Sequence, residues 1–91
     1  MSELIVGRVL EVGDHPGARA PSFLLRVDLG PRGTVEAQME PGGYAKDELL
    51  GTLMVVSIAD GEAIALAARS HARGPVLIRP DGDVEPGTAV A

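Results

Sequence analysis

The side chains of this sequence that are best suited to chemistry bind anions rather than break bonds. Seven of the eight cationic residues are arginine, and its planar guanidinium can hold a phosphate through two hydrogen bonds or stack on a base. From residue 69 to residue 79, three arginines and one histidine occur without an acid. The candidates for an RNA-binding surface are Arg26, Tyr44, Arg69, His71, Arg73 and Arg79.

No pattern typical of catalysis accompanies these residues. The only histidines, His15 and His71, lie far apart in the sequence, and a pair of histidines alone is a poor indication of a metal site. The sequence has no cysteine, which excludes disulfides and thiolate zinc sites. It also lacks a glycine-rich phosphate loop and a Ser-His-Asp order. We therefore expect a protein that is not an enzyme and that has no catalytic residue, cofactor or metal.

The overall charge limits how strongly the arginines can bind nucleic acid. The formal net charge is −5, whereas a nucleic-acid-binding domain usually carries a basic patch. The charge also reverses immediately after the arginines, in the acidic residues 81–85. If Arg26, Arg69, Arg73 and Arg79 shared one surface, they could meet about four phosphates, which predicts a salt slope of roughly −3.

The elements that must position these residues are predicted to be short strands. Phe23, Leu25, Val27 and Leu29 alternate with more polar residues, which is the period of a strand with one buried face. Residues 4–12 form a similar strand that Gly7 interrupts, as a close backbone approach would require. Residues 34–39 are the expected hairpin partner, and the apolar residues 52–59 are typical of a central strand.

One segment remains ambiguous between helix and strand. Residues 62–70 are rich in alanine, which favours a helix, but they follow the tight-turn dipeptide at 60–61, which favours a hairpin strand. We favour the strand. Its alternation would then place Ile64, Leu66 and Ala68 on one face and leave a small, smooth outer face of alanines at 63, 65 and 67.

Residues 44–51 are predicted to form a short helix that ends at Gly51, with Leu49 and Leu50 docked inward. Residues 76–80 and 87–90 are further short extended segments. Five or six strands with one helix after the third predict an all-β protein, a small five-stranded Greek-key OB-fold barrel with one short helix. We expect a single domain over residues 1–91.

Four stretches carry a resemblance to a known family: residues 6–30, 37–38, 44–56 and 76–90. In them the sequence resembles the bacterial tRNA-binding-domain family of OB folds, and within it the stand-alone CsaA type. That resemblance implies a homodimer with tRNA binding and an export-related chaperone role. The sequence departs from the family pattern at Val35 and Glu36, and in residues 57–66, which are shorter and more acidic than the segment that normally borders the RNA-binding surface.

Two functions from different classes follow. The leading hypothesis is binding of tRNA or another structured RNA, with Tyr44 either stacking on a base or seating the helix, and with protonated His71 assisting phosphate binding. The alternative is a chaperone that binds unfolded client proteins, in which Ser22, Leu24 and Arg26 form an outer face that accepts an extended segment by strand addition. Leu24 could instead be buried in a dimer interface. A third possibility is an assembly module.

The N-terminal residues 1–12 carry Glu3 and Arg8 and contain no long apolar run. We therefore expect neither a signal peptide nor membrane insertion. Together with the absence of cysteine, this predicts a cytoplasmic protein.

Overall fold

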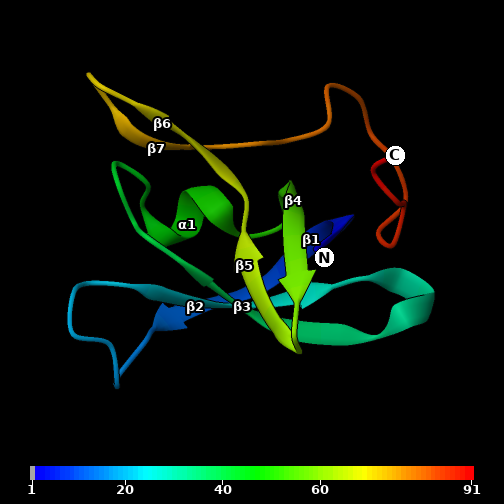
Figure 1. Cartoon of the computed structure of the whole chain (residues 1–91), viewed down its shortest axis with the longest axis horizontal. Helices are drawn as coiled ribbons and strands as arrows, with labels where there is room; N and C mark the ends of the chain where they lie inside the picture. The colour runs from blue at the N-terminus through cyan, green and yellow to red at the C-terminus, as the bar shows by residue number, and fades with distance from the viewer. Residues whose placement is uncertain (1) are drawn as a thin grey trace.

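Five strands close into a barrel (Figure 1). The computed structural model describes residues 2–91. The barrel strands are β1 (Glu3–Asp14), β2 (Phe23–Asp28), β3 (Thr34–Met39), β4 (Leu53–Ala59) and β5 (Glu62–Ala65). Their order around the barrel is β1-β2-β3-β5-β4, with a parallel contact between β3 and β5 and antiparallel contacts elsewhere. The predicted small all-β barrel of the OB type is confirmed.

Strand β1 is long because it pairs with two neighbours in succession. Its first half pairs with β4, from Glu3 to Arg8, and its second half pairs with β2, from Arg8 to Asp14. A shift of register between Val9 and Glu11 marks the place where the strand bends, as a β-bulge does. A single bent strand therefore joins both sides of the barrel.

The close backbone approach expected at Gly7 is present. A Cβ atom built on Gly7 would lie 3.0 Å from a side-chain carbon of Leu29 and closer still to Val27. Because glycine has only a hydrogen atom in place of a side chain, β1 can pass directly over the inward face of β2 at this position.

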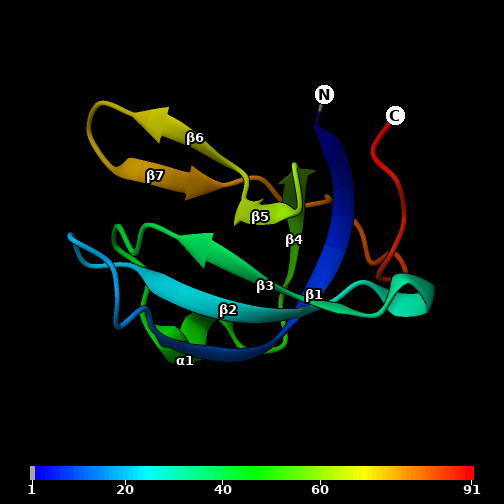
Figure 2. The ribbon, with the colours of Figure 1, turned by 60° about the horizontal axis from the view of Figure 1, so that its bottom comes forward.

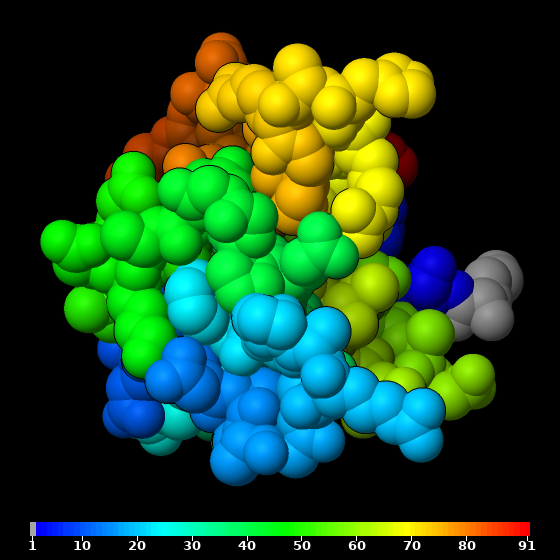
Figure 3. Space-filling model, turned by 90° about the vertical axis from the view of Figure 1, so that its left-hand side faces the viewer, coloured from blue at the N-terminus to red at the C-terminus, as the bar shows by residue number. Residues whose placement is uncertain are grey.

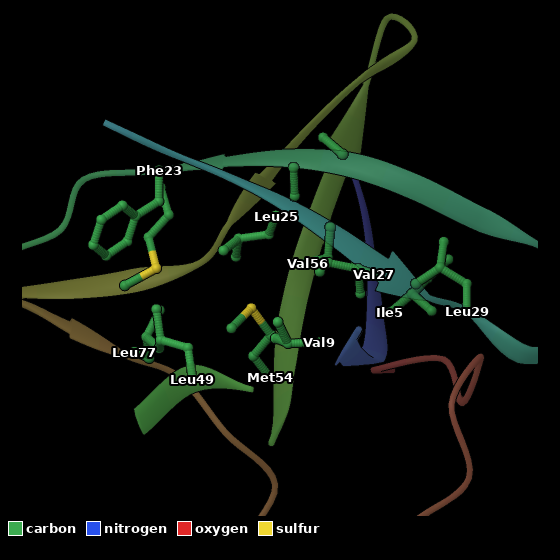
Figure 4. Close-up of a cluster of buried hydrophobic side chains, with 13 residues drawn as sticks. Ile5, Val9, Phe23, Leu25, Val27, Leu29, Leu49, Met54, Val56 and Leu77 are labelled. Atoms are coloured by element: carbon green, nitrogen blue, oxygen red, sulfur yellow. The ribbon is translucent and has the colours of Figure 1, made fainter. Parts of the chain in front are cut away.

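The core consists of aliphatic side chains, with Phe23 as its aromatic ring (Figure 4). The inward face of β2 supplies Phe23, Leu25 and Val27, each at most 9% exposed, as the alternation predicted. Helix α1 (Lys46–Leu49) contributes the fully buried Leu49. The thirteen side chains of the cluster lie inside the barrel or cover its end.

Helix α1 is one turn long, shorter than the predicted helix over residues 44–51. Gly51 follows it with φ of +75°, the left-handed conformation of a C-terminal glycine, so the expected stop is confirmed. The expectation that Leu50 docks inward is wrong, because its side chain is 50% exposed. Leu50 has ψ of 130° and has already left the helix, so it no longer lies on the face that buries Leu49.

Residues 62–70 are extended rather than helical. A turn at Asp60 and Gly61, both with positive φ, leads into β5, and β6 (Ala67–Ser70) follows. The predicted assignment of faces in this segment is wrong, since Ala63 is 8% exposed and Ile64 is 50% exposed. The reason is the barrel closure: Ala63 lies opposite the fully buried Ala37 of β3, and two small side chains let these strands meet.

A second hairpin projects from the barrel. Strand β6 pairs with β7 (Gly74–Leu77) in a separate two-stranded sheet, so the chain has two more strands than the barrel. The 3₁₀ turn η1 (Gly30–Arg32) connects β2 to β3. The C-terminal segment then returns to β1, where Val90 N–H donates to the carbonyl of Leu4. Within residues 2–91, no helix is long and apolar enough to cross a membrane.

Replacing Gly7 tests the tight crossing of β1 over β2. We expect Gly7→Ala to lower the free energy of unfolding by about 1–3 kcal/mol, because the added methyl overpacks the core against Val27. Gly13→Ala in the same strand is the matched control, since its nearest neighbour would lie 4.0 Å from the new Cβ. The measurement is urea denaturation, and equal midpoints for the two variants would contradict this account.

Candidate functional site

Arg26 lies on the outer face of the barrel, between acids. Its guanidinium is 3.3 Å from the carboxylate of Glu11, and Glu36 is its direct neighbour across β2 and β3. Cross-strand neighbours of opposite charge attract each other. Arg26 is therefore partly neutralised by the sheet that holds it.

Arg69 is paired more closely than Arg26. Its Nη2 and Nη1 donate to the two carboxylate oxygens of Glu40 at 2.8 and 3.1 Å. These hydrogen bonds hold the pKa of Glu40 below its usual value, and they raise the pKa of Arg69. The pair joins β6 to the residue that follows β3, so it links the second hairpin to the barrel.

Tyr44 seats the second hairpin on the core. Its hydroxyl oxygen accepts a hydrogen bond from the backbone N–H of Leu77 at 3.0 Å, and its ring packs against the core cluster. The guanidinium of Arg79 lies 5.7 Å from the ring centroid, within the range of a cation–π contact. Tyr44 therefore has a structural role, but it holds the second hairpin rather than the helix as predicted, and Arg79 lies over its ring.

The candidate arginines do not line one common hollow. Arg73 lines a small hollow of about 130 Å³ together with Tyr44 and Glu48, and His71 is exposed in the turn between β6 and β7. The structure thus brings Arg73 and Arg79 to Tyr44, whereas Arg26 and Arg69 line two other hollows.

Ion pairs occupy five of the eight cationic side chains. The pairs are Arg8–Asp83, Arg26–Glu11, Arg32–Glu3, Lys46–Asp14 and Arg69–Glu40. Across residues 2–91, the cations outside these pairs are Arg19, Arg73 and Arg79. At most two of the four arginines proposed to bind phosphate are therefore free to do so.

One hollow of the described chain is mostly apolar. It has a volume of about 480 Å³ and lies between the second hairpin, the end of β3 and the loop before β2 (Figure 3). We call it the apolar groove; its lining is Ala18, Ala20, Pro21, Ser22, Gln38, Met39, Glu40, Ile64, Ala65, Leu66, Ala67, Arg69, Pro75 and Leu77. Ten of these fourteen residues are apolar, and Glu40 and Arg69 form its ion pair.

The apolar groove was not predicted from the sequence. The expected protein-binding face was Ser22, Leu24 and Arg26, but only Ser22 lines the groove, while Leu24 and Arg26 line a different hollow beside Glu11 and Glu36. The groove is formed by segments distant in sequence, so no local pattern indicates it. The one apolar residue that could have indicated it locally is the half-exposed Ile64. The sequence pattern assigned Ile64 to the inner face of the strand, so its exposure was not predicted.

Comparison with known proteins identifies the fold more closely. No protein-family model and no curated protein matches the sequence. The CsaA chaperone protein of Picrophilus torridus superposes with a TM-score of 0.86 at 27% identity, over 99% of this chain and 92% of that chain. The chain therefore has the fold of a CsaA chaperone protein. The chaperone CsaA of Bacillus anthracis str. Ames has the same fold, with a TM-score of 0.85 at 23% identity, over 99% of this chain and 91% of that chain.

The Glu40–Arg69 pair predicts how the stability of this chain responds to acid. Because the folded-state pKa of Glu40 is lowered, the contribution of the pair to stability is present at neutral pH and is lost as the pH falls through that pKa. We expect Arg69→Met to raise the pKa of Glu40 back toward the usual value, about 4.3. Carboxyl NMR titration measures this shift.

Glu3 provides the internal control for that titration, since Arg32 binds it in the same two-oxygen manner at 2.7 and 2.8 Å. Hydrogen bonds from Arg32 likewise lower the pKa of Glu3. Glu3 should titrate alike in the parent and in Arg69→Met. An unchanged Glu40 titration would show that the pair does not persist in solution.

Proposed function

We propose that this protein is a non-enzymatic chaperone that binds exposed apolar segments of unfolded client proteins, with the apolar groove as its contact surface. The observation that carries the proposal is the groove itself, an open hollow with ten apolar lining residues. The likeness to a CsaA chaperone protein over almost the whole chain supports it. A chaperone of this kind needs neither a catalytic residue nor a cofactor.

The chemistry of the groove suits many different client segments. Unfolded proteins expose apolar surface, and burying it releases about 25 cal/mol per Å². The ten apolar residues of the lining are alanine, proline, aliphatic residues and one methionine, without an aromatic ring, so they offer apolar contact without a shaped pocket for one side chain. Ile64 is the most exposed large apolar residue of the lining, and we expect it to contribute most of the contact.

A charge in the groove should abolish client binding without unfolding the protein. We expect Ile64→Lys to reduce, at least about fivefold, the suppression of light scattering by a heat-denatured model client, because binding would then bury a charge. Leu50→Lys is the matched control, since Leu50 is also 50% exposed but lies outside the groove. If both variants protect the client as well as the parent does, the groove is not the binding surface.

RNA binding is the second candidate function, and one observation favours it. Arg73 and Arg79 are outside the ion pairs of the described chain, and both lie beside Tyr44. Such a cluster can hold phosphate and add a stacking contact to a base. It is much smaller than the six-residue surface expected from the sequence, so we expect weak binding of tRNA at most.

The salt dependence of tRNA binding tests this candidate. With two free arginines, the slope of log affinity against log salt should be roughly −0.7 × 2, or about −1.4, rather than −3. Fluorescence anisotropy at several salt concentrations measures it, with the double variant Arg73→Gln/Arg79→Gln and with Arg26→Gln as the paired-arginine control. Undetectable binding at low salt, or equal losses in the two variants, would reject this surface.

The homodimer that the resemblance implies and the cytoplasmic location expected from the composition remain predictions. Sedimentation at high protein concentration tests the dimer, and a monomer there would reject it.

A further inference from the structure

The second hairpin has an edge whose backbone groups have no partner in the described chain. Pro75 has no N–H and lies opposite Arg69, and the N–H of Leu77, opposite Ala67, turns away to the hydroxyl of Tyr44. The hydrogen-bonded pairs of an antiparallel ladder alternate with such unbonded pairs. The ladder bonds of this hairpin are therefore made at Ala68 and Ser70, and the peptide groups of Ala67 and Arg69 point to the outer edge of β6.

This edge borders the apolar groove. Ala67 and Arg69 line the groove, as do Pro75 and Leu77 opposite them on β7. Cross-strand neighbours share one face of a sheet, so the groove lies against the face of the hairpin that carries these four residues. A strand added at the edge of β6 would therefore direct alternate side chains into the groove.

The groove lies between β3 and β6. These strands diverge because the pairing of β3 with β5, which closes the barrel, is short. Strands β3 and β5 pair at Ala37–Ala63 and Gln38–Ile64. At Leu66 the chain turns away, since its N–H donates to Val55 and its carbonyl accepts from Ile78. Beyond that point Figure 2 shows β6 and β3 spreading apart, and the Glu40–Arg69 pair connects them through the ends of two long side chains.

We propose that the outer edge of β6 binds one extended segment of a client polypeptide as an added strand, with small or branched apolar side chains at alternate positions entering the apolar groove. This inference rests on the proposed chaperone function and specifies its mode of binding. A polypeptide is the occupant because its backbone supplies hydrogen-bond partners for the unpaired N–H and C=O groups of Ala67 and Arg69, at the strand spacing of about 4.8 Å. Nucleic acid offers no such ladder, and Glu40 already neutralises Arg69 on this rim.

Backbone methylation of a probe peptide tests the mode of binding directly. The probe is a fluorescein-labelled heptapeptide of alternating valine and serine with a lysine at each end, and two analogues carry N-methyl groups on all valines or on all serines. Strand addition predicts that one analogue loses affinity by at least about tenfold, since each lost hydrogen bond costs about threefold to tenfold, while the other binds as the parent peptide does. Loss in the valine analogue indicates antiparallel addition, and loss in the serine analogue indicates parallel addition.

The other results of this experiment have distinct meanings. If all three peptides bind equally, or if both analogues lose affinity equally, strand addition is wrong and the groove binds side chains alone. If none binds and the denatured client is also unprotected, the proposed chaperone function has failed. These outcomes separate the mode of binding from the function.

A pair of variants at Ala67 tests the same edge from the protein side. Ala67→Pro removes the outward N–H without removing a bond to β7, a position where proline is tolerated in an edge strand. Ala67→Val adds similar bulk to the groove but keeps the N–H. We expect at least about threefold weaker probe binding for Ala67→Pro than for Ala67→Val, and equal binding would overturn the proposal.

Sedimentation of the same two variants identifies a competing occupant. If the parent and Ala67→Val are dimers and Ala67→Pro is a monomer, the edge of β6 pairs with a second copy of this chain, and the proposal is wrong. An unchanged oligomeric state together with weaker probe binding supports it.

Discussion

The rest of the structure depends on the short parallel seam between β3 and β5. A barrel of five short strands must close somewhere, and here it closes where Ala37 meets Ala63, two side chains small enough for the strands to approach. The seam ends after Gln38 and Ile64, because Leu66 turns to bond with Val55 and Ile78. The second hairpin and the apolar groove both result from that early departure.

Electrostatics then decide which surfaces remain available. The chain has thirteen acids and eight cations, so most cations of a compact fold find a carboxylate nearby. Arg26 and Arg69 are each held by one, and such exposed pairs contribute little stability. Their larger effect is to remove positive charge from the surface, which leaves the apolar groove and the small cluster around Tyr44 as the two surfaces that we propose for binding.

The same scaffold occurs at low sequence identity because its core requirements are simple. Aliphatic side chains of about the right volume can replace one another when the pattern is kept, which fits a TM-score of 0.86 at 27% identity. The groove depends on more specific features. The hydroxyl of Tyr44 anchors β7 at Leu77. Pro75 has no N–H, so it cannot form a hydrogen-bonded pair with Arg69 opposite it. These few contacts hold an unpaired strand edge beside apolar surface.

The sequence by itself determined the barrel strands and the barrel, whereas the helix is shorter than predicted. Alternation fixed the buried face of β2, the turn at residues 60–61 fixed a strand rather than a helix after it, and Gly7 and Gly51 marked a close approach and a helix end. Only the tertiary structure decided the exposed positions of Ile64 and Leu50 and the groove. The physical reason is range: turns and periodicity act over a few residues, whereas the Glu40–Arg69 and Tyr44–Leu77 contacts join positions 29 and 33 residues apart, where no local pattern carries information about the partner.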